Sequence, residues 1–436
     1  METLIENVKE LYESKKLSKD QVNALIEPGD AIILPAAGTE PMVITPELNN
    51  ATHFKGNRLY RMLALTPVID LPEDQLKQYS FFLSGADRKA MRQGIVDLIP
   101  GHFSEIPAIL KEREKEPILI VQASPMNEEG YFSFGITSGY TTSVAKYAKK
   151  IILEVNKNMP FVHGQDMKVH IKDIAGFVET EVPLPELPEV ELSESEIAIG
   201  KTVADIVSDG DTIQIGFGSI PNAVMKALGD KKDLGIHSEM FPSTAVELAE
   251  KGALTNVNKE LMPNKHVGTF VLGTKKLYDF IDNNPDVELM PVEYTNGLKE
   301  LSQLDHLVSI NTTLEVDFLG QCNSEQLEDF YYSNTGGQSD FAIGARLAKH
   351  GIGIVCLQST AKKGTISRIV PHLHSGSPVS TTKNDVDIVV TEFGAAHLKN
   401  KSIQERVEAL ISVAHPDFRD KLRSKAIELG YLTNNK

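Results

Sequence analysis

Apolar and polar positions along this chain predict an alternation of strands and helices. Short apolar runs at 117–125, 150–156 and 351–360 have the length of buried strands. Apolar residues in SIQERVEALISVA, at 402–414, instead recur every three to four positions, which is typical of a helix packed on a core. Because strands alternate with helices, we expect an α/β fold with mostly parallel sheets covered by helices. Functional sites in such folds lie at the carboxyl ends of the strands.

One pattern occurs twice, 181 residues apart. We expect an amphipathic helix that ends at Gly29-Asp30 in one copy and at Gly210-Asp211 in the other, and each is followed by a short apolar strand (AIILPAAG and TIQIGFG). Each strand then enters a turn that contains proline. This repetition predicts two related α/β domains.

The boundary between the two domains is expected at Glu181–Glu196. This stretch holds three prolines and six glutamates without lysine or arginine, which favours an extended linker. An acidic surface loop within one domain is the alternative. Ser193 and Glu196 have the spacing of a capping box for the following helix. We therefore expect domains at residues 1–184 and 193–436.

Composition narrows the functional classes. The 436 residues include 41% hydrophobic and 24% charged side chains, as in ordinary globular proteins, and carry a net charge of −16. This charge disfavours binding to nucleic acid or to an anionic membrane, although a few local lysines can still hold a small anion. With only two cysteines, no secretory signal and no apolar run of 18 residues, we expect a cytoplasmic protein without membrane spans.

A glycine-containing turn after the strand of the second copy is the first candidate site. Two glycines allow the backbone to approach a ligand closely and to point free N–H groups at it. The first copy has Pro35, Ala36 and Ala37 at these positions. A dinucleotide-binding turn is the alternative, but proline replaces its third glycine. The turn consists of Gly216, Phe217, Gly218, Ser219, Ile220 and Pro221.

Glu239 is the candidate catalytic residue. It ends a short apolar segment, LGIHSE, and Met240 and Phe241 follow it. Such surroundings would partly desolvate the carboxylate, which makes it more basic and more nucleophilic. A solvated glutamate at a strand end is the alternative on this pattern alone.

Several longer motifs resemble one known family. GFGSIPNAV, GIHSEMF, INTTLEVDFLGQ, YYSNTGGQSDFAIGA, STAKKGTISRIVP and VVTEFGAAHLKNKSIQERVEALISVAHPDFR are similar to the acetyl-CoA hydrolase/transferase family, above all to its 4-hydroxybutyrate and butyryl-CoA:acetate CoA-transferase branch. SPMNEEGYFSFG and EVNKNMP extend the resemblance into the first half. The resemblance implies two CoA-transferase-like domains with the active site at their interface.

The resemblance also implies roles for individual residues. Glu239 corresponds to the family's catalytic glutamate, and the turn at 216–221 to its oxyanion-stabilising and CoA-binding turn. Further contacts to the thioester or to CoA are implied for Asn311, Leu314, Gly336, Gly337 and Lys362. No metal site and no permanently bound cofactor are implied, because coenzyme A is a substrate that is linked to Glu239 only transiently. The expected partners are an acyl-CoA, a short carboxylate and a second copy in a homodimer.

The implied reaction transfers CoA from a short-chain acyl-CoA to a carboxylate such as 4-hydroxybutyrate, butyrate or acetate. It proceeds by ping-pong catalysis through a glutamyl-CoA thioester. Hydrolysis of acyl-CoA by the same glutamate is the alternative, and a non-catalytic CoA-binding protein is a third. Glu392, at another strand end, is the rival carboxylate, and His372 with His374 forms a weak metal pattern that surface histidines explain better.

Overall fold

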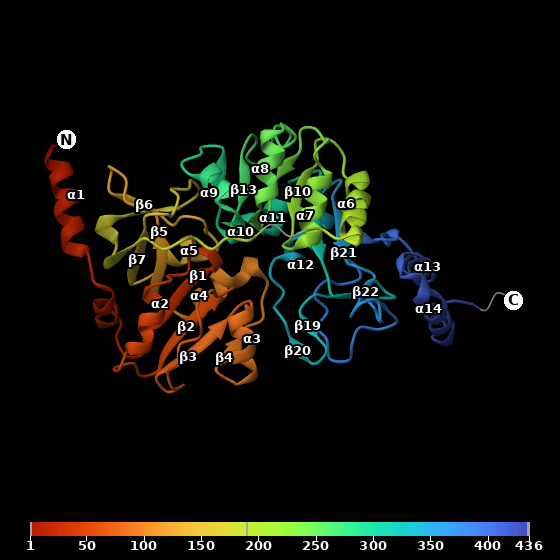
Figure 1. Ribbon diagram of the computed structural model, residues 1–436, viewed down its shortest axis with the longest axis horizontal. Helices are drawn as coiled ribbons and strands as arrows, with labels where there is room; N and C mark the ends of the chain where they lie inside the picture. Colours follow the sequence, from red (N-terminus) through yellow and green to blue (C-terminus); the bar gives the residue numbers. More distant parts are fainter. Residues whose placement is uncertain (1, 189–190, 434–436) are drawn as a thin grey trace. The chain divides into compact units, whose positions relative to one another are not determined.

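The computed structural model describes residues 2–188 and 191–433, which form two compact α/β units (Figure 1). The first unit comprises residues 2–188, 241–243 and 267–295, and the second comprises the remaining described residues. The second domain expected at 193–436 therefore differs from the observed unit, since two of its stretches pack with the N-terminal unit. Backbone hydrogen bonds explain this for the stretch 267–295: the Val271 N–H donates to the Ile136 carbonyl at 2.8 Å, and the Leu289 N–H to the His163 carbonyl at 2.9 Å.

The first unit is built on a seven-stranded sheet in which every neighbouring pair is parallel, in the order β4-β3-β2-β1-β5-β7-β9. The expected runs at 117–125 and 150–156 form two of its strands. The strands are β1 (Ala31–Ala36), β2 (Asn57–Met62), β3 (Leu76–Ser80), β4 (Val96–Leu98), β5 (Ile118–Ala123), β7 (Lys150–Asn156) and β9 (Gly176–Thr180).

The second unit is built on a six-stranded sheet in the order β11-β10-β16-β21-β25-β26, in which only the last strand is antiparallel. The strands are β10 (Thr212–Ile215), β11 (Gly235–Ile236), β16 (Leu307–Thr312), β21 (Ile352–Cys356), β25 (Ile388–Thr391) and β26 (Gly394–His397). The expected α/β class with mostly parallel sheets is confirmed.

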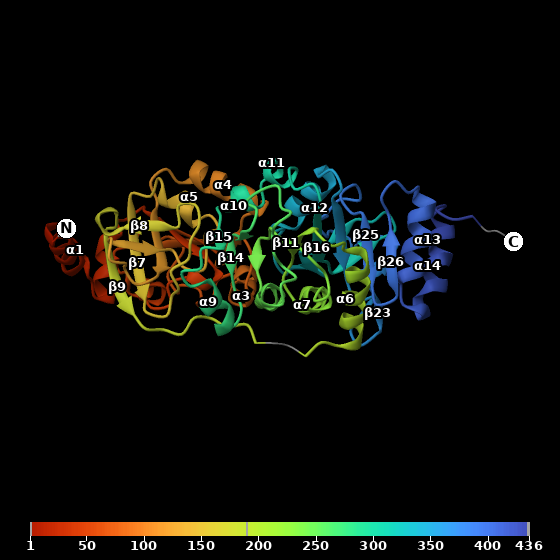
Figure 2. The ribbon, with the colours of Figure 1, turned by 90° about the horizontal axis from the view of Figure 1, so that it is seen from above.

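Helices cover the second sheet on both faces. Figure 2 shows α6 and α7 along one side of the strands and α11 and α12 along the other. The helix expected at 402–414 is α13. The helices of this unit are α6 (Glu194–Ile206), α7 (Ser219–Ala227), α8 (Ser243–Glu250, whose first residue belongs to the first unit), α11 (Leu298–Leu301), α12 (Gln338–Leu347), α13 (Ile403–Val413) and α14 (Pro416–Glu428).

The remaining elements are the helices of the first unit and the minor strands. In the first unit the helices are α1 (Glu2–Lys15), α2 (Ile44–Glu47), α3 (Gly85–Arg92), α4 (Ile106–Arg113), α5 (Thr141–Ala145), α9 (Lys275–Ile281) and α10 (Val292–Thr295). The minor strands along the chain are β6 (Tyr131–Ser133), β8 (Lys168–His170), β12 (Met240–Phe241), β13 (His266–Gly268), β14 (Phe270–Val271), β15 (Val287–Leu289), β17 (Glu315–Asp317), β18 (Cys322–Asn323), β19 (Gln326–Leu327), β20 (Phe330–Tyr331), β22 (Thr360–Ala361), β23 (Ile366–Ser367) and β24 (Ile369–Val370).

The expected linker begins as extended chain. Its residues 181–188 contain no helix, and the Leu187 N–H donates to the Gly273 carbonyl at 2.9 Å, so this part of the chain runs along the first unit. Residues 189 and 190 lie outside the described residues. The capping box of Ser193 and Glu196 is present at the start of α6. The helix expected before Gly29 is instead a short 3-10 helix, Lys19–Leu25.

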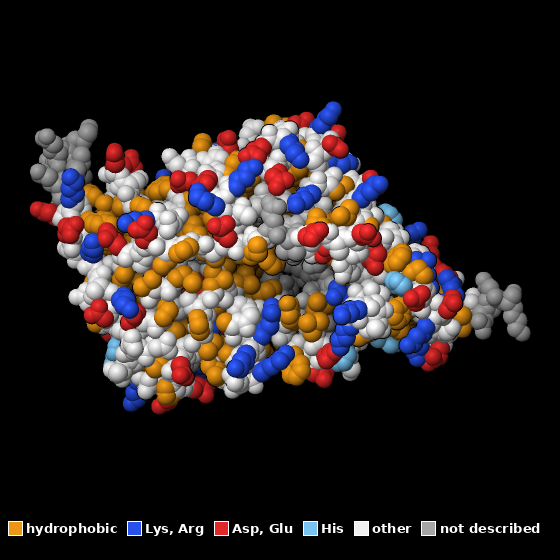
Figure 3. Space-filling view, in the orientation of Figure 1, with side chains coloured by type: hydrophobic (Ala, Val, Ile, Leu, Met, Phe, Trp, Pro, Cys, Tyr) orange, Lys and Arg blue, Asp and Glu red, His pale blue; other side chains and the backbone are white. Residues whose placement is uncertain are grey.

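Acidic and basic side chains are interspersed on the face shown in Figure 3, so the net charge of −16 is not gathered into one patch there. Among the helices of the described part of the chain, none is both long and apolar enough to cross a membrane. The thiols of Cys322 and Cys356 are free and buried.

Candidate active site

The carboxyl ends of β10 and β11 bring Glu239 close to the glycine turn. The two strands are parallel neighbours, with Ile213 paired to Ile236. Beyond the paired residues, the Ser238 hydroxyl donates to the Ile215 carbonyl and accepts from the Ile215 N–H, both at 3.1 Å. Ser238 immediately precedes Glu239, and Ile215 immediately precedes the turn. The fold thus joins two sequence-predicted site elements at one edge of the sheet.

The Glu239 carboxylate is held by Asn296 and enclosed by Gly337. Asn296 Nδ2 donates to Glu239 Oε2 at 2.9 Å. A Cβ atom at Gly337 would lie 1.9 Å from the same oxygen, so only glycine leaves room for the carboxylate there. The Glu239 side chain keeps partial exposure, yet the loss of hydration around its carboxyl group raises the pKa to about 7. Other than the Asn296 contact, no described residue donates a hydrogen bond to this carboxylate.

Asp340 adds a second carboxylate to this cluster. It lies in the first turn of α12, is 4% exposed, and accepts from the same Asn296 Nδ2 at 3.4 Å. Its negative charge also raises the Glu239 pKa, after desolvation, while the Asn296 hydrogen bond lowers it. Asn296 is fully buried, so one amide group separates two carboxylates that would otherwise repel each other more strongly.

The glycine turn presents backbone N–H groups at the start of α7. Within the described residues, the amides of residues 217–220 donate no hydrogen bond. Gly218 has φ +128°, a conformation that side-chain-bearing residues rarely adopt. The Ser219 hydroxyl donates to Glu196 of α6, so the donor that Ser219 can offer to a ligand is its backbone N–H. Phe217 is 60% exposed. The amides and the positive end of the α7 dipole suit an anion or a developing oxyanion.

The Asn311 side chain packs against this turn. It is 7% exposed, and its Nδ2 donates to Gln214 Oε1 at 3.0 Å and to the Ser309 hydroxyl at 3.1 Å. A Cβ at Gly216 would lie 3.1 Å from Asn311 Oδ1, which places this side chain against the turn. Leu314 is partly exposed, and its N–H donates to the Asn323 carbonyl at 3.0 Å.

The remaining predicted residues differ in their surroundings. Gly336, with φ +58°, and Gly337 form the entry to α12, where Gly337 touches Glu239. Lys362 lies at the tip of the β22–β23 hairpin, is exposed, and pairs with Glu328 at 2.7 Å. Glu328, its partner among the described residues, is not a member of the Glu239 cluster.

Both oxygens of Glu392, the rival carboxylate, are engaged by hydrogen bonds within the protein. Glu392 lies between β25 and β26, where its two oxygens accept from the Ser359 N–H at 2.9 Å and the Ser359 hydroxyl at 2.6 Å. His372 and His374 are both exposed. Within the described residues there is no group of three or more His, Cys, Asp or Glu side chains suited to a metal ion.

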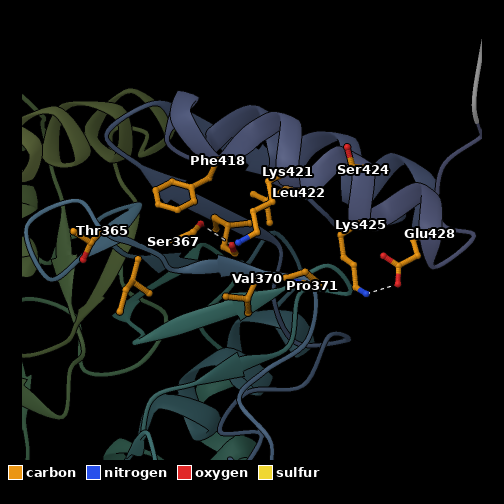
Figure 4. Close-up of a pocket in the computed structure, with 12 residues that line it drawn as sticks. Thr365, Ser367, Val370, Pro371, Phe418, Lys421, Leu422, Ser424, Lys425 and Glu428 are labelled. Carbon is orange, nitrogen blue, oxygen red and sulfur yellow. Dashed lines mark hydrogen bonds and ion pairs between the residues drawn. The ribbon is translucent and has the colours of Figure 1, made fainter.

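A cavity of about 740 Å³ lies elsewhere in the second unit, between α14 and the segment 365–371 (Figure 4). Phe418 and Leu422 of α14 and Ile369 and Val370 of β24 contribute apolar walls, and Lys425 at its rim pairs with Glu428. None of the predicted site residues lines it.

Sequence reasoning missed two members of the cluster, Asn296 and Asp340. Asn296 stands in the polar stretch EYTNGLKE, where an asparagine before a glycine is typical of a turn. Asp340 falls in the first helical turn after Gly336-Gly337, where acidic residues are common for reasons of helix stability. For Asp340, closeness in the sequence to the predicted Gly336 and Gly337 was the one signal that could have indicated a place in the site.

The chain is similar to known proteins over most of its length. Residues 3–214 match the model of the acetyl-CoA hydrolase/transferase N-terminal domain, and residues 273–426 match that of the C-terminal domain. The chain is 40% identical to a succinyl-CoA:cyclohexane-1-carboxylate CoA transferase of Geobacter metallireducens, over 97% of this chain and 98% of that protein. It is also 40% identical to a 4-hydroxybutyrate coenzyme A transferase of Clostridium kluyveri, over 95% and 98%.

The fold is shared as well. The crystal structure of RipA from Yersinia pestis superposes with a TM-score of 0.91 at 33% identity, covering 98% of this chain and 100% of that one. More distant relatives include an acetyl-CoA hydrolase of Neurospora crassa, 24% identical over 77% of this chain and 72% of that protein. With both family models matched over most of its length and full-length relatives at 40% identity, the chain belongs to the acetyl-CoA hydrolase/transferase family.

Proposed function

We propose that this protein is a CoA-transferase that moves CoA from a short-chain acyl-CoA to a short carboxylate, with Glu239 as the covalent nucleophile. The observation that carries the proposal is the state of the Glu239 carboxylate. It is partly desolvated, hydrogen-bonded by Asn296 through one oxygen, and connected through Ser238 to a strand end that leads into free backbone amides. The CoA-transferase names of relatives at 40% identity support the same activity.

In the first half of the reaction, a Glu239 oxygen attacks the thioester carbonyl of the acyl-CoA. Asn296 engages Oε2 and leaves Oε1 without a donor among the described residues, so Oε1 is the attacking atom. With a pKa of about 7, Glu239 is more basic than an ordinary glutamate and is still largely ionised in mildly alkaline solution. The charge that develops on the thioester oxygen is stabilised by N–H groups of the turn at 216–221. Collapse of this adduct breaks the C–S bond and gives an acyl-glutamyl anhydride and the CoA thiolate.

In the second half, the thiolate adds to the glutamyl carbonyl and expels the acyl group as a carboxylate, leaving a glutamyl-CoA thioester. Negative charge then builds on Oε2, the oxygen that already accepts from Asn296. An incoming carboxylate reverses these steps and leaves as the new acyl-CoA. One thioester replaces another, so the exchange is close to isoenergetic.

The CoA portion is assigned to four parts of the second unit. We place its pantetheine end near the turn and Gly336-Gly337, with Asn311 holding the turn and Leu314 offering an apolar contact. Lys362, on an exposed hairpin, is assigned to a CoA phosphate or to the ribose. A surface ion pair such as Lys362–Glu328 contributes little stability, so exchange of Glu328 for a phosphate costs little.

The acceptor is a short carboxylate such as 4-hydroxybutyrate, butyrate or acetate, and hydrolysis by the same glutamate is the second candidate. Water competes for the anhydride and for the thioester in both cases, so the two functions differ only in how well the site excludes it. We also propose that the protein is a cytoplasmic homodimer with domains near residues 1–184 and 193–436, the second interrupted as described above.

Trapping the intermediate tests the mechanism. Borohydride added to the protein with an acyl-CoA should reduce the glutamyl thioester, and peptide mass mapping should find the modification on Glu239. A modification on Glu392 or on any other carboxylate would overturn the assignment. Glu392→Gln serves as the matched control, because its trapping yield should equal that of the unsubstituted protein.

A panel of acceptors separates the two candidate functions. Initial rates are measured with one acyl-CoA and a series of two- to six-carbon carboxylates, with water alone as the reference acceptor. A transferase shows parallel lines in double-reciprocal plots and turnover that depends on the carboxylate. Comparable turnover without any carboxylate would assign the protein as a hydrolase.

A further inference from the structure

Lys259 is a buried lysine that the proposed mechanism does not use. It is 4% exposed, and its Nζ donates to the Ile236 carbonyl at 2.9 Å and to the Lys265 carbonyl at 2.6 Å. No carboxylate of the described residues pairs with it. Burial lowers its pKa to about 7. An ammonium group placed among backbone carbonyls is costly, so its position calls for an explanation beyond ordinary packing.

The Ile236 carbonyl that Lys259 contacts lies on the outer edge of β11. The Gly235 and His237 N–H groups donate to two carbonyls on the side of the neighbouring strand β10, those of Asp211, just before that strand, and of Ile213 within it. The polar groups of Ile236 therefore point the other way, and β11 is the edge strand of its sheet. Side chains satisfy them in place of a further strand. The Ile236 N–H donates to Asn256 Oδ1 at 2.8 Å, and the Ile236 carbonyl accepts from Lys259.

The stem of Lys259 is fitted to the same strand. A Cβ atom at Gly235 would lie 2.6 Å from Lys259 Cγ and 2.8 Å from its Cδ, so the absence of a side chain at 235 makes room for the lysine. Lys259 also joins β11 to the end of the loop 256–265, in which Asn256, Met262 and Asn264 have positive φ angles. The lysine thus anchors a two-residue strand and the loop that borders it at one point.

We infer that Lys259 is a positioning residue for Glu239, which lies three residues beyond the carbonyl that Lys259 holds. The inference rests on the proposed function of Glu239. From Ile236 onward each residue has a fixed contact: Ile236 with Lys259 and Asn256, His237 with Ile213, and Ser238 with Ile215. Loss of the first contact frees the outer edge of the strand, and the displacement passes along the backbone to the nucleophile.

Reaction rate is sensitive to such a displacement, because an attacking atom that moves by about 1 Å can lose about 100-fold in rate. The substrates bind through other groups, so their affinities should change less than the rate of the chemical step. A residue that served folding alone would lower the folded fraction but would leave the turnover of each folded molecule unchanged.

Lys259→Met is the first test, since it keeps an apolar stem beside Gly235 and removes the donors. We expect kcat per folded protein to fall by about 10- to 100-fold, with both KM values within about threefold of those of the unsubstituted protein. The folded fraction is measured by near-UV circular dichroism. Lys231→Met is the matched control: Lys231 also donates to a backbone carbonyl, that of Val207, but at the other end of β10 and β11. Its kcat should be unchanged.

Lys259→Gln extends the test and covers failure of the methionine variant to fold. Glutamine keeps one amide donor, so we expect a kcat between those of Lys259→Met and the unsubstituted protein. An unchanged kcat in Lys259→Gln or Lys259→Met, or an equal loss in Lys231→Met, would overturn the inference. Borohydride mapping of the unsubstituted protein keeps the two proposals apart. If Glu239 is not labelled, the proposed function fails, whereas labelled Glu239 with unaffected lysine variants refutes only the role of Lys259.

Discussion

The turns at Gly29-Asp30 and Gly210-Asp211 share the φ angle of the glycine and a hydrogen bond to the aspartate, although the strands that follow them lead into different surroundings. Both glycines have φ +83°. In each turn the aspartate accepts from the N–H three residues earlier, at 2.8 Å for Asp30 and 2.7 Å for Asp211. The strand that follows, β1 or β10, is flanked on both sides by parallel neighbours. The repeat predicted from sequence is therefore also a repeat in backbone conformation.

The two copies differ at the carboxyl ends of their strands. The first strand ends at Ala36, which is buried like Ala37 after it, whereas the second leads into a turn whose Phe217 is 60% exposed. The neighbouring strands differ as well. Ala31 pairs with Arg58 in the first copy and Thr212 with Gly235 in the second, and four residues farther on stand Met62 and Glu239. The first copy thus has a buried methionine where the second has the proposed nucleophile.

Buried carboxylates also occur in the first unit, where more of their acceptor capacity is used by hydrogen bonds. Glu40 is 1% exposed and accepts from the Leu65 and Thr66 N–H groups and from the Thr66 hydroxyl. Glu154 accepts from three successive N–H groups, those of residues 42–44. Glu239 accepts only from Asn296 among the described residues. Desolvation raises the pKa of all three, so the unused acceptor capacity, and not burial, distinguishes Glu239.

The largest expected effect comes from exchanging the residues that separate the two copies. Glu239→Met gives the second copy the residue of the first, and we expect kcat to fall by at least about 10⁴-fold because the covalent route is lost. Thermal unfolding should show a protein at least as stable as before, since a partly desolvated carboxylate is removed. Acyl transfer above about 1% of the original rate would contradict the role of Glu239.

The reverse exchange, Met62→Glu, is the control for that experiment. Met62 is 1% exposed, so a carboxylate there would be buried without a prepared partner. We expect a loss of about 3–5 kcal/mol in the free energy of unfolding and no new activity. The comparison would weaken if this variant kept its stability, because Met62 would then not occupy an apolar environment.

Gly337→Ala should have the next largest effect. A methyl group at this position overlaps Glu239 Oε2 and lies 2.3 Å from Asn296 Nδ2, so the carboxylate must move or the helix start must shift. We expect kcat to fall by about 100-fold or more, with the melting temperature little changed, since Gly337 has a negative φ that alanine accepts. Steady-state kinetics with thermal unfolding checks both parts. Gly344→Ala is a useful contrast: its Cβ would meet Leu301, an apolar side chain of the core, so stability should fall while kcat per folded molecule is kept.

How much of the site was predictable follows from where its residues stand in the sequence. Glu239 and the turn at 216–221 each follow directly on an apolar strand, and their motifs resemble a known family, so the sequence predicts both as site candidates. Asn296 and Asp340 lie 57 and 101 residues farther along the chain, and only the folded sheet brings them to Glu239. No local spacing encodes a hydrogen bond between residues so far apart.

The fold shows the same limit. The parallel sheets and the positions of β5, β7, β21 and α13 followed from apolar periodicity, because each element is buried on a regular face. The return of residues 267–295 to the first unit did not, since it depends on pairings such as Val271 with Ile136 across more than a hundred residues. The segment before Gly29 had a helical apolar pattern but forms a 3-10 helix of seven residues.

The pH dependence of activity and of stability sharpens the contrast between Glu239 and the buried carboxylates of the first unit. Because the pKa of Glu239 is raised to about 7, kcat/KM should rise about tenfold per pH unit below pH 7 and level off above it. Asp340→Asn removes a charge that raises this pKa, so the midpoint should move to lower pH. A midpoint near the ordinary glutamate value, with unchanged position in Asp340→Asn, would show that another group limits the rate.

The same pKa predicts a stability effect of the opposite sign. A carboxyl group with a folded pKa above its unfolded value binds its proton more tightly in the folded state, so its ionisation destabilises the fold as pH rises from about 4.5 to 7. Glu239→Gln should therefore be more stable than the unsubstituted protein at pH 8, by up to about 3 kcal/mol, and equally stable near pH 4. Urea unfolding at the two pH values measures this difference.

The smallest expected effect tests the similarity of the two copies instead of their difference. Alanine at Gly29 or at Gly210 must adopt the same left-handed conformation, which costs about 1–2 kcal/mol. Open space surrounds Gly29, while a Cβ at Gly210 would lie 3.1 Å from Asn258 Nδ2, a side chain that can move away. We therefore expect nearly equal losses in the free energy of unfolding and no change in kcat per folded molecule. Asparagine at either position should cost less than alanine, because it tolerates this conformation better. A large loss at only one glycine would mean that the shared φ angle hides different constraints, and that the two turns are alike in geometry but not in energy.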